Sequence, residues 1–253
     1  MLKKLFAFTL LGLIITSCSG SLDTTNLTAE ERLAYSMKLY ENEDYEDAAK
    51  EFEALLLQFP GSAVSDDAQF YLAMTRYKRG EFIIGAYEFS KLIKGMPTSE
   101  FVPQAQFMLA ECYYQLSPDF SLDQKYTKKA IEEFQVFIDF FPLDSKVAEA
   151  EKKINELNDK LARKEYSTAV IYEKLEYTKA ALKYYDNVME IYHDTQYAPL
   201  AHYNKINLLL SKNRNQEALD AANSFLQKYP NDPNFSSVEK IKSSLESKLS
   251  VSN

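Results

Sequence analysis

The chain has 253 residues, of which 46% are hydrophobic, 26% charged and 13% aromatic, a balance typical of a folded globular protein and not of a disordered one. Only six glycines and eight prolines occur, too few turn-forming residues for a β-sandwich or barrel, so we expect a helical fold. The formal net charge of -8 opposes binding to phosphate, which argues against nucleic acid as a partner.

The N-terminal residues have the layout of an export signal. Two lysines precede an apolar run over residues 5–15. As a helix this run rises only about 16 Å, whereas the hydrocarbon core of a bilayer is roughly 30 Å thick. The run ends in the sequence Ile-Thr-Ser-Cys, which closes at Cys18 and resembles a bacterial lipobox. We therefore predict a lipoprotein signal peptide over 1–17, lipidation of Cys18 and a lipidated linker over 18–27, the alternative being an ordinary secretory signal with an incidental cysteine.

The second cysteine, Cys112, lies in an amphipathic helical pattern. If Cys18 carries lipid, the mature chain keeps a single thiol and forms no internal disulfide. We predict that Cys112 is a buried small hydrophobe and neither a nucleophile nor a metal ligand.

An internal repeat organises the rest of the chain. The segment Tyr45–Phe52, followed by Phe-Pro-Gly-Ser at 59–62, recurs 37 residues later as Phe82–Phe89, followed by Met-Pro at 96–97. Further copies give repeats that close near residues 60, 97, 142, 193 and 230. Repeat three carries an extra loop around 117–123, and the long fourth unit has no Gly or Pro from 146 to 176, which predicts one or two extended helices.

Apolar residues recur at three- and four-residue intervals, so each predicted helix has one buried stripe. Small residues at one site of each repeat, Ala48, Gly85, Ala130, Ala180 and Ala218, predict close approach of two helices. The pattern resembles the tetratricopeptide repeat, although its usual Trp is absent. We predict an all-α, right-handed superhelical solenoid of about five tetratricopeptide-like helix pairs over 28–250, with a C-terminal capping helix over 234–249.

Catalytic and cofactor motifs are missing from the sequence. It contains no glycine-rich phosphate loop and no G-x-S-x-G, and its two histidines, His193 and His202, form no metal-binding motif. We interpret both as surface or partly buried helix histidines. The sequence therefore predicts no enzyme, no cofactor and no metal site.

Four aromatic residues, Tyr35, Tyr40, Phe70 and Tyr77, fall on the first helices of repeats one and two. Aromatic side chains in the groove of a helical solenoid are good anchors for an extended peptide. Because most tyrosines in such solenoids are core residues, we expect one or two of these four to be exposed in a candidate peptide groove.

The lipobox, the five repeats and the segment Leu157–Tyr172 together resemble the BamD family of outer-membrane assembly lipoproteins. The resemblance implies a non-catalytic scaffold of the β-barrel assembly machinery, lipid-anchored at the periplasmic face of the outer membrane. It implies that later repeats dock the barrel-forming subunit and other machine lipoproteins, with Lys160, Arg163 and Lys164 as candidate contacts. It also implies that the early repeats receive C-terminal segments of client barrel proteins.

Three other classes of protein compete with this interpretation. A tetratricopeptide-repeat lipoprotein adaptor of the Tol-Pal, cell-division or pilus-assembly systems shares the lipobox and the repeats, and differs mainly at 157–172. A glycan-binding lipoprotein of the SusD type is about twice as long and carries large insertions. An enzyme with an unrecognised site comes last, because no catalytic motif supports it.

Overall fold

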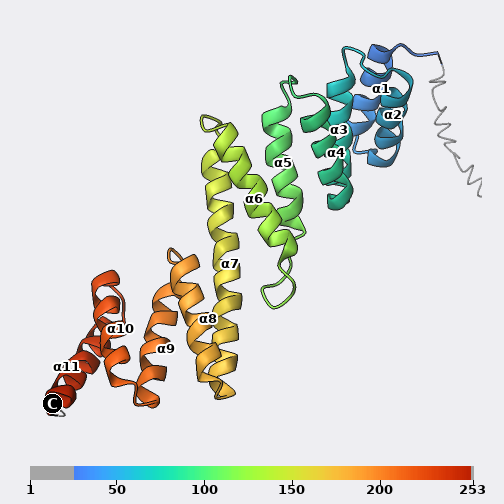
Figure 1. The fold of residues 1–253 in the computed structure, drawn as a ribbon. Helices are drawn as coiled ribbons and strands as arrows, with labels where there is room; N and C mark the ends of the chain where they lie inside the picture. Colours follow the sequence, from blue (N-terminus) through green and yellow to red (C-terminus); the bar gives the residue numbers. More distant parts are fainter. Residues whose placement is uncertain (1–25, 252–253) are drawn as a thin grey trace, which may run out of the picture.

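The computed structural model describes residues 26–251, which form eleven helices in an elongated stack (Figure 1). The prediction of an all-helical fold is confirmed. The helices are α1 (Ala29–Glu41), α2 (Tyr45–Gln58), α3 (Ser65–Lys78), α4 (Phe82–Gly95), α5 (Val102–Gln115), α6 (Lys125–Phe140), α7 (Val147–Lys174), α8 (Thr178–Ile191), α9 (Tyr197–Ser211), α10 (Asn215–Lys228) and α11 (Phe235–Val251).

Each helix packs mainly against the helices that precede and follow it in the chain. This arrangement gives five antiparallel pairs, α1–α2 to α9–α10, with α11 covering the end of the stack. The repeat-closing residues 60, 97, 142, 193 and 230 each lie directly after the residue that caps the second helix of a pair. Because every pair touches only its neighbours, stability arises from nearest-neighbour interfaces.

Local sequence explains where helices begin and turn. At the start of α1, Thr28 and Glu31 form a capping box: the Glu31 N–H donates to Thr28 Oγ1 over 3.3 Å, and the Thr28 N–H donates to Glu31 Oε2 over 2.9 Å. In the tight turns within pairs one, two, four and five, one residue adopts a positive φ: Glu43, Gly80, Glu176 and Asn213. Pair three instead has its longer loop, as the extra residues there predict.

The core consists of the same few repeat positions in each pair. The small residue of each second helix is buried, and at Gly85 an added Cβ would lie 3.3 Å from Cys112 Sγ, which shows how closely these helices approach. In repeat four the fully buried alanine is Ala181 and not the predicted Ala180, a shift of one residue. Four residues after this small residue, each second helix has another buried residue. It is large in repeats one to four and small in repeat five: Phe52, Phe89, Phe134, Tyr185 and Ala222.

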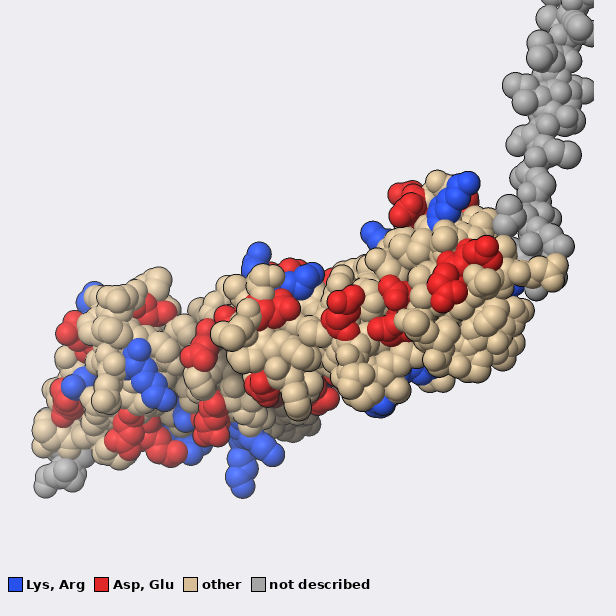
Figure 2. Space-filling model, turned by 90° about the horizontal axis from the view of Figure 1, so that it is seen from above, with Lys and Arg blue, Asp and Glu red and all other residues tan. Residues whose placement is uncertain are grey.

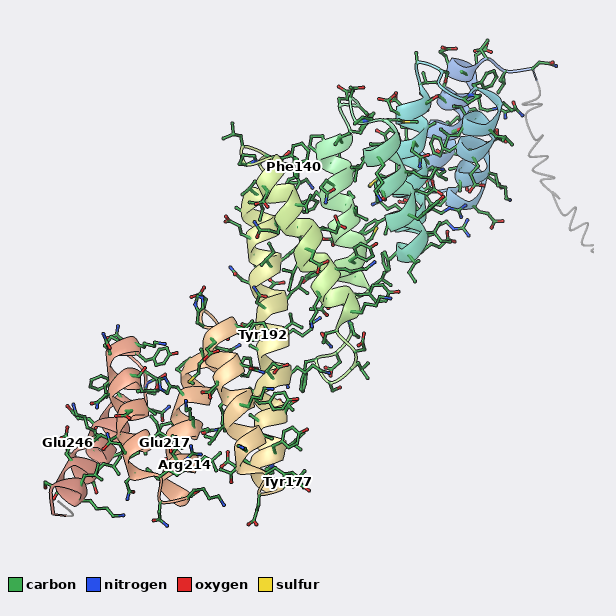
Figure 3. All side chains as sticks on the ribbon, in the orientation of Figure 1. Phe140, Tyr177, Tyr192, Arg214, Glu217 and Glu246 are labelled. Atoms are coloured by element: carbon green, nitrogen blue, oxygen red, sulfur yellow. The ribbon has the colours of Figure 1, made fainter. Side chains whose placement is uncertain are left out.

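The long fourth unit is a single helix, α7, which at 28 residues is about 42 Å long. Its N-terminal part contributes Ala150 and Leu157 to the core of repeats two and three, and its C-terminal part contributes Ala169 to the core of repeats four and five. In Figure 1 this helix bridges the two halves of the stack. Figure 3 shows Phe140 near its beginning and Tyr177 at its end, both largely exposed apolar side chains.

Acidic side chains are spread along the face drawn in Figure 2, with basic side chains interspersed and no continuous basic surface on that face. This distribution agrees with the net charge of -8. None of the helices in residues 26–251 is both long and apolar enough to cross a membrane.

Candidate partner-binding surfaces

The aromatic residues of the predicted peptide groove differ in their surroundings. Tyr35 and Tyr40 on α1 and Tyr77 on α3 are partly exposed. Tyr40 packs edge-on against Tyr45 and Tyr71, with ring centroids 5.7 and 5.4 Å apart. The Tyr77 hydroxyl donates to Glu111 Oε1 over 3.4 Å, and burial together with the Glu111 charge raises the pKa of Tyr77 to about 12.

Phe70 lies in the core, so the prediction that it lines the groove is wrong. It is 2% exposed, stacks on Phe101 with ring centroids 4.6 Å apart, and meets Phe89 edge-on at 6.0 Å. Its neighbour Tyr71 is partly exposed and contacts Tyr40 instead. The helical register differs by one residue from the one expected from the sequence.

The three predicted partner contacts on α7 hold the loop between α5 and α6. Lys160 Nζ donates to Ser117 Oγ over 2.7 Å, and Lys164 Nζ donates to the carbonyl oxygen of Leu122 over 2.7 Å. The Arg163 guanidinium lies over the Phe120 ring, 3.9 Å from its centroid. Partial burial lowers the pKa of Lys160. These cations therefore fix a loop to the long helix, a role that the sequence analysis did not predict.

Of the three, Arg163 remains largely exposed. It lines a pocket of about 440 Å³ together with Phe120 of the loop and Asp159 of α7. This pocket gives the middle of α7 a surface at which a partner chain can make polar and aromatic contacts.

The two cysteines have different outcomes. Cys18 lies outside the described residues. Cys112 is fully buried, and burial raises the pKa of its thiol to about 12, as predicted for a structural residue. A thiol with so high a pKa is almost never ionised near neutral pH and is a poor nucleophile.

The two histidines also differ. His193 is exposed, with Nδ1 2.6 Å from Asp194 Oδ1, in agreement with the surface interpretation. His202 is 4% exposed, so its interpretation as a surface or partly buried residue is wrong. Burial, together with the charges of Lys205 and Lys228, lowers the pKa of His202 to about 4, so that its imidazole is neutral near pH 7.

A polar position recurs in the first helices, buried in repeats one, two, three and five and half-buried in repeat four, and the sequence analysis missed it. Counted back from each closing residue, with the extra loop of repeat three left out, the same site is occupied by Arg32, Gln69, Gln106, Glu165 and His202. Gln69 Nε2 donates to Glu88 Oε2 over 2.8 Å and to the Glu88 carbonyl over 3.1 Å. Gln106 makes the same two bonds to Glu133, with the same two lengths. In repeat one, Arg32 Nε lies 3.8 Å from Glu51 Oε2.

We call the contacts of Arg32, Gln69 and Gln106 with their glutamates the polar ladder. They join the first helix to the second helix at the same repeat position in repeats one to three. The signal that would have found them is a polar residue at a fixed distance from each closing residue, surrounded by apolar neighbours. Within residues 26–251, no group of three or more His, Cys, Asp or Glu side chains is arranged to hold a metal ion.

Comparison with known proteins places the chain in a family. It is 23% identical to the outer membrane protein assembly factor BamD of Rickettsia prowazekii over 231 residues, which are 90% of this chain and 92% of that protein. The BamD of Caulobacter vibrioides is 29% identical over 107 residues, 42% of this chain and 35% of that one.

Among solved structures, a tetratricopeptide-repeat protein of Thermus thermophilus is 19% identical with a TM-score of 0.37, covering 86% of this chain and 98% of its own. The TPR2AB domain of yeast Sti1 is 16% identical with a TM-score of 0.44, covering 87% and 84%. The model of the YfiO family, described as outer membrane lipoprotein, matches residues 28–214. Since this match covers most of the chain, the protein belongs to the YfiO family of outer membrane lipoproteins.

Proposed function

We propose that the protein is a scaffold lipoprotein of the machinery that assembles outer-membrane proteins. The observation that carries this proposal is the similarity to a BamD assembly factor along nearly the whole length of both chains. An elongated stack of helix pairs suits such a role, because it presents separate surfaces to several polypeptides at fixed spacing.

The early repeats supply the surface for client proteins in this proposal. Tyr35, Tyr40 and Tyr77 are partly exposed, and each presents a flat apolar ring. The hydroxyls of Tyr35 and Tyr40 can donate a hydrogen bond, whereas that of Tyr77 already donates to Glu111. These properties suit an extended segment, such as the C-terminal segment of a client barrel protein, whose backbone needs hydrogen-bond partners.

The middle of the stack supplies the surface for the barrel-forming subunit and for the machine's other lipoproteins. Arg163 is exposed beside the Phe120 ring, whereas Lys160 and Lys164 act through the loop that they hold. A change at either lysine therefore disturbs docking by releasing the loop, and a change at Arg163 disturbs it directly.

The anchor is the lipid on Cys18, which holds the stack at the periplasmic face of the outer membrane. Two acyl signals are enough for stable anchoring without a spanning helix. The residues between Cys18 and Thr28 then serve as a tether of at most about 35 Å.

A detergent pulldown of the tagged lipoprotein from its own envelope tests the proposal. We expect recovery of an outer-membrane barrel protein that carries periplasmic domains, and reduced recovery with Arg163→Ala compared with the exposed control Lys152→Ala on the same helix. Recovery of Tol-Pal components or pilus subunits in place of the barrel protein contradicts the proposal. Cys18→Ala tests the anchor separately, because the protein should then appear in the soluble periplasmic fraction.

A further inference from the structure

Repeat five breaks the polar ladder of the first three repeats. In repeats one to three the buried polar residue faces a glutamate on the second helix of the pair: Glu51, Glu88 or Glu133. The equivalent residue of repeat five is Ala221, which lies nine positions before its closing residue, as Glu88 does before residue 97. Its partner on α9 is His202. Repeat five therefore keeps the buried polar group and lacks the carboxylate.

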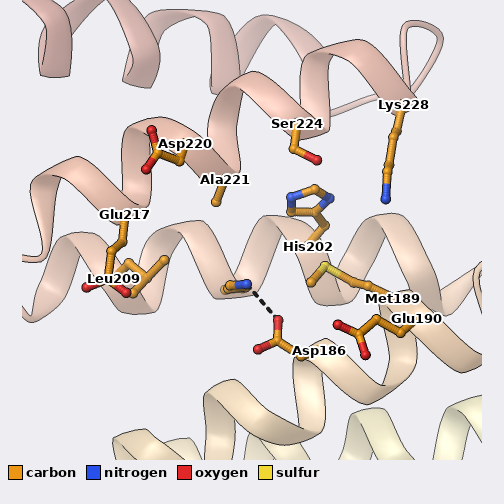
Figure 4. A pocket seen from close by; sticks show the side chains of 11 residues that line it. Asp186, Met189, Glu190, His202, Leu209, Glu217, Asp220, Ala221, Ser224 and Lys228 are labelled. Atoms are coloured by element: carbon orange, nitrogen blue, oxygen red, sulfur yellow. Dashed lines mark hydrogen bonds and ion pairs between the residues drawn. The ribbon is translucent and has the colours of Figure 1, made fainter.

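A pocket occupies the place where that carboxylate would lie. It has a volume of about 380 Å³ and is lined by His202 and Ala221 with residues of α8, α9 and α10 (Figure 4). His202 is 4% exposed, and its Nδ1 is a buried nitrogen with no hydrogen-bond partner. In Figure 4 the imidazole lies between Ser224 and Met189, with Lys228 extending toward the same space from the end of α10.

Three of the six charged side chains that line the pocket form ion pairs within the protein. Lys205 Nζ lies 2.6 Å from Asp186 Oδ1, and Glu217 pairs with Arg214, whereas Asp220 Oδ1 accepts a hydrogen bond from the neutral Gln216 over 3.0 Å and keeps its charge. Within residues 26–251, the side chains of Lys228 and Ser224 have no such partner. Glu190, which also lines the pocket, lies on the α8 side, across the space from Lys228 (Figure 4).

We propose that this pocket binds a carboxylate of another polypeptide, an Asp or Glu side chain, which takes the place of the glutamate that repeats one to three supply themselves. Lys228 would provide the positive charge and Ser224 would donate a hydrogen bond. His202 Nδ1 would donate one only when the ring is protonated, because the neutral ring has a single N–H and the Ala221 backbone accepts it. The polypeptide source of the carboxylate rests on the proposed scaffold function, whereas the carboxylate specificity rests on the pocket alone.

The electrostatics at His202 support an anion. Burial lowers the pKa of His202 most, and the positive charges of Lys205 and Lys228 lower it further, whereas the Ala221 backbone and Asp186 raise it by less. The other charged groups facing the pocket are Glu190 from α8 and Glu217 and Asp220 from α10. A carboxylate bound beside the ring stabilises its protonated form and raises its pKa. Binding should therefore strengthen as the pH falls from 7 to about 5, which stays above the pKa of about 4.3 at which a glutamate carboxylate becomes protonated.

The test is an NMR titration of the two histidine side chains in the full lipoprotein, held in detergent micelles. The probe is the α-amide of N-acetylglutamate, which carries one carboxylate, and the neutral control is the corresponding glutamine derivative. We expect the acidic probe to shift the His202 signals with a dissociation constant of about 1 mM, equivalent to about 4 kcal/mol. His193 is exposed and serves as an internal reference that should not move.

Matched variants separate this site from the rest of the surface. Ala221→Glu restores the missing carboxylate within the chain and should weaken probe binding by at least about tenfold, because it fills the pocket and repels the anion. Asn223→Glu adds the same charge at an exposed position of α10 and should leave binding within about twofold. Lys228→Met should weaken binding by about tenfold, the effect of losing a charge-assisted hydrogen bond.

Several results would overturn the proposal: no shift of His202 at saturating probe, equal binding of the glutamine derivative, equal binding of inorganic phosphate, or unchanged binding in Ala221→Glu. Because the titration contains no partner protein, it is independent of the pulldown that tests the scaffold function. If the probe binds but the pulldown recovers no barrel protein, only the scaffold function is contradicted. If the pulldown succeeds but the probe does not bind, only the pocket proposal is contradicted.

Discussion

In repeats two and three, a glutamine on the first helix donates a hydrogen bond to a glutamate on the second helix. In repeat five, His202 lies opposite Ala221, and a pocket remains between the helices. The backbones follow the same plan in all three, since the small buried residue lies twelve positions before each closing residue. A repeat architecture can therefore keep its helix packing and vary one polar position. That position determines whether the interface is complete within the chain or needs a group from outside.

The largest effect should come from making the core of repeat three resemble that of repeat five. Phe134 is fully buried and meets Phe107 edge-on at 5.5 Å, and its equivalent in repeat five is Ala222. Phe134→Ala should cost about 3–5 kcal/mol of unfolding free energy, because a large cavity remains among rigid neighbours. Urea unfolding followed by circular dichroism measures the loss. A cost below about 1 kcal/mol would mean that repeat three collapses around small residues as repeat five does.

The next largest effect should be a loss of stability in repeat five at low pH. The pKa of His202 is about 4 in the folded protein, whereas an unperturbed histidine has a value near 6.5. Between these two pKa values, the imidazole of His202 is protonated in the unfolded chain and neutral in the folded protein. Stability is complete above about pH 6.5 and falls as the pH drops toward 4, by about 3 kcal/mol in total.

Hydrogen exchange of α9 and α10 across this pH range reports the local loss in repeat five. His202→Gln, which stays neutral, should remove the dependence between pH 6.5 and 4, while α3 and α4 serve as the internal control. An equal loss of protection in both regions would show that His202 is not the responsible group.

A smaller effect should follow when repeat two is given the alanine of repeat five. Glu88→Ala leaves Gln69 without its side-chain acceptor while keeping the backbone carbonyl bond. We expect a loss of about 1–3 kcal/mol, the cost of a buried polar group that loses one hydrogen bond. Thermal unfolding measures it, and the double variant Gln69→Leu with Glu88→Ala should recover part of the loss. If the double variant is no more stable than Glu88→Ala, the polar contact is not the cause.

The smallest effect is expected for Lys91, which lies at the surface beside the contact between Gln69 and Glu88. Lys91 Nζ lies 3.0 Å from Glu88 Oε2, but its side chain is about half exposed. Lys91→Ala should change the unfolding free energy by less than about 0.5 kcal/mol, because exposed ion pairs are screened and entropically costly. The same thermal experiment checks it. A loss as large as that of Glu88→Ala would assign the stabilisation to charge and not to the buried hydrogen bond.

Much of the fold was predictable because repeat periodicity is a local property. The closing residues, the extra loop at 117–123 and the proline-free fourth unit marked the helix pairs, and the small, aromatic and apolar positions marked the buried stripes. The burial of Cys112 followed from its amphipathic surroundings. The errors at Phe70 and Ala180 are each one residue from the correct position, because several faces of a helix in a stack contact neighbours and a periodic pattern alone does not fix the register.

The helical class, the number and order of the repeats and the resemblance to the family could all be predicted from residue spacing along one chain. Which polar residues meet could not be predicted in this way, because it depends on how the helices pack. The tertiary structure directed Lys160 and Lys164 to a loop about forty residues away in the sequence, joined Gln69 to Glu88, and left His202 beside a pocket. The physical reason is that burial and hydrogen bonding depend on distances between separate helices, which only the packing of the stack sets.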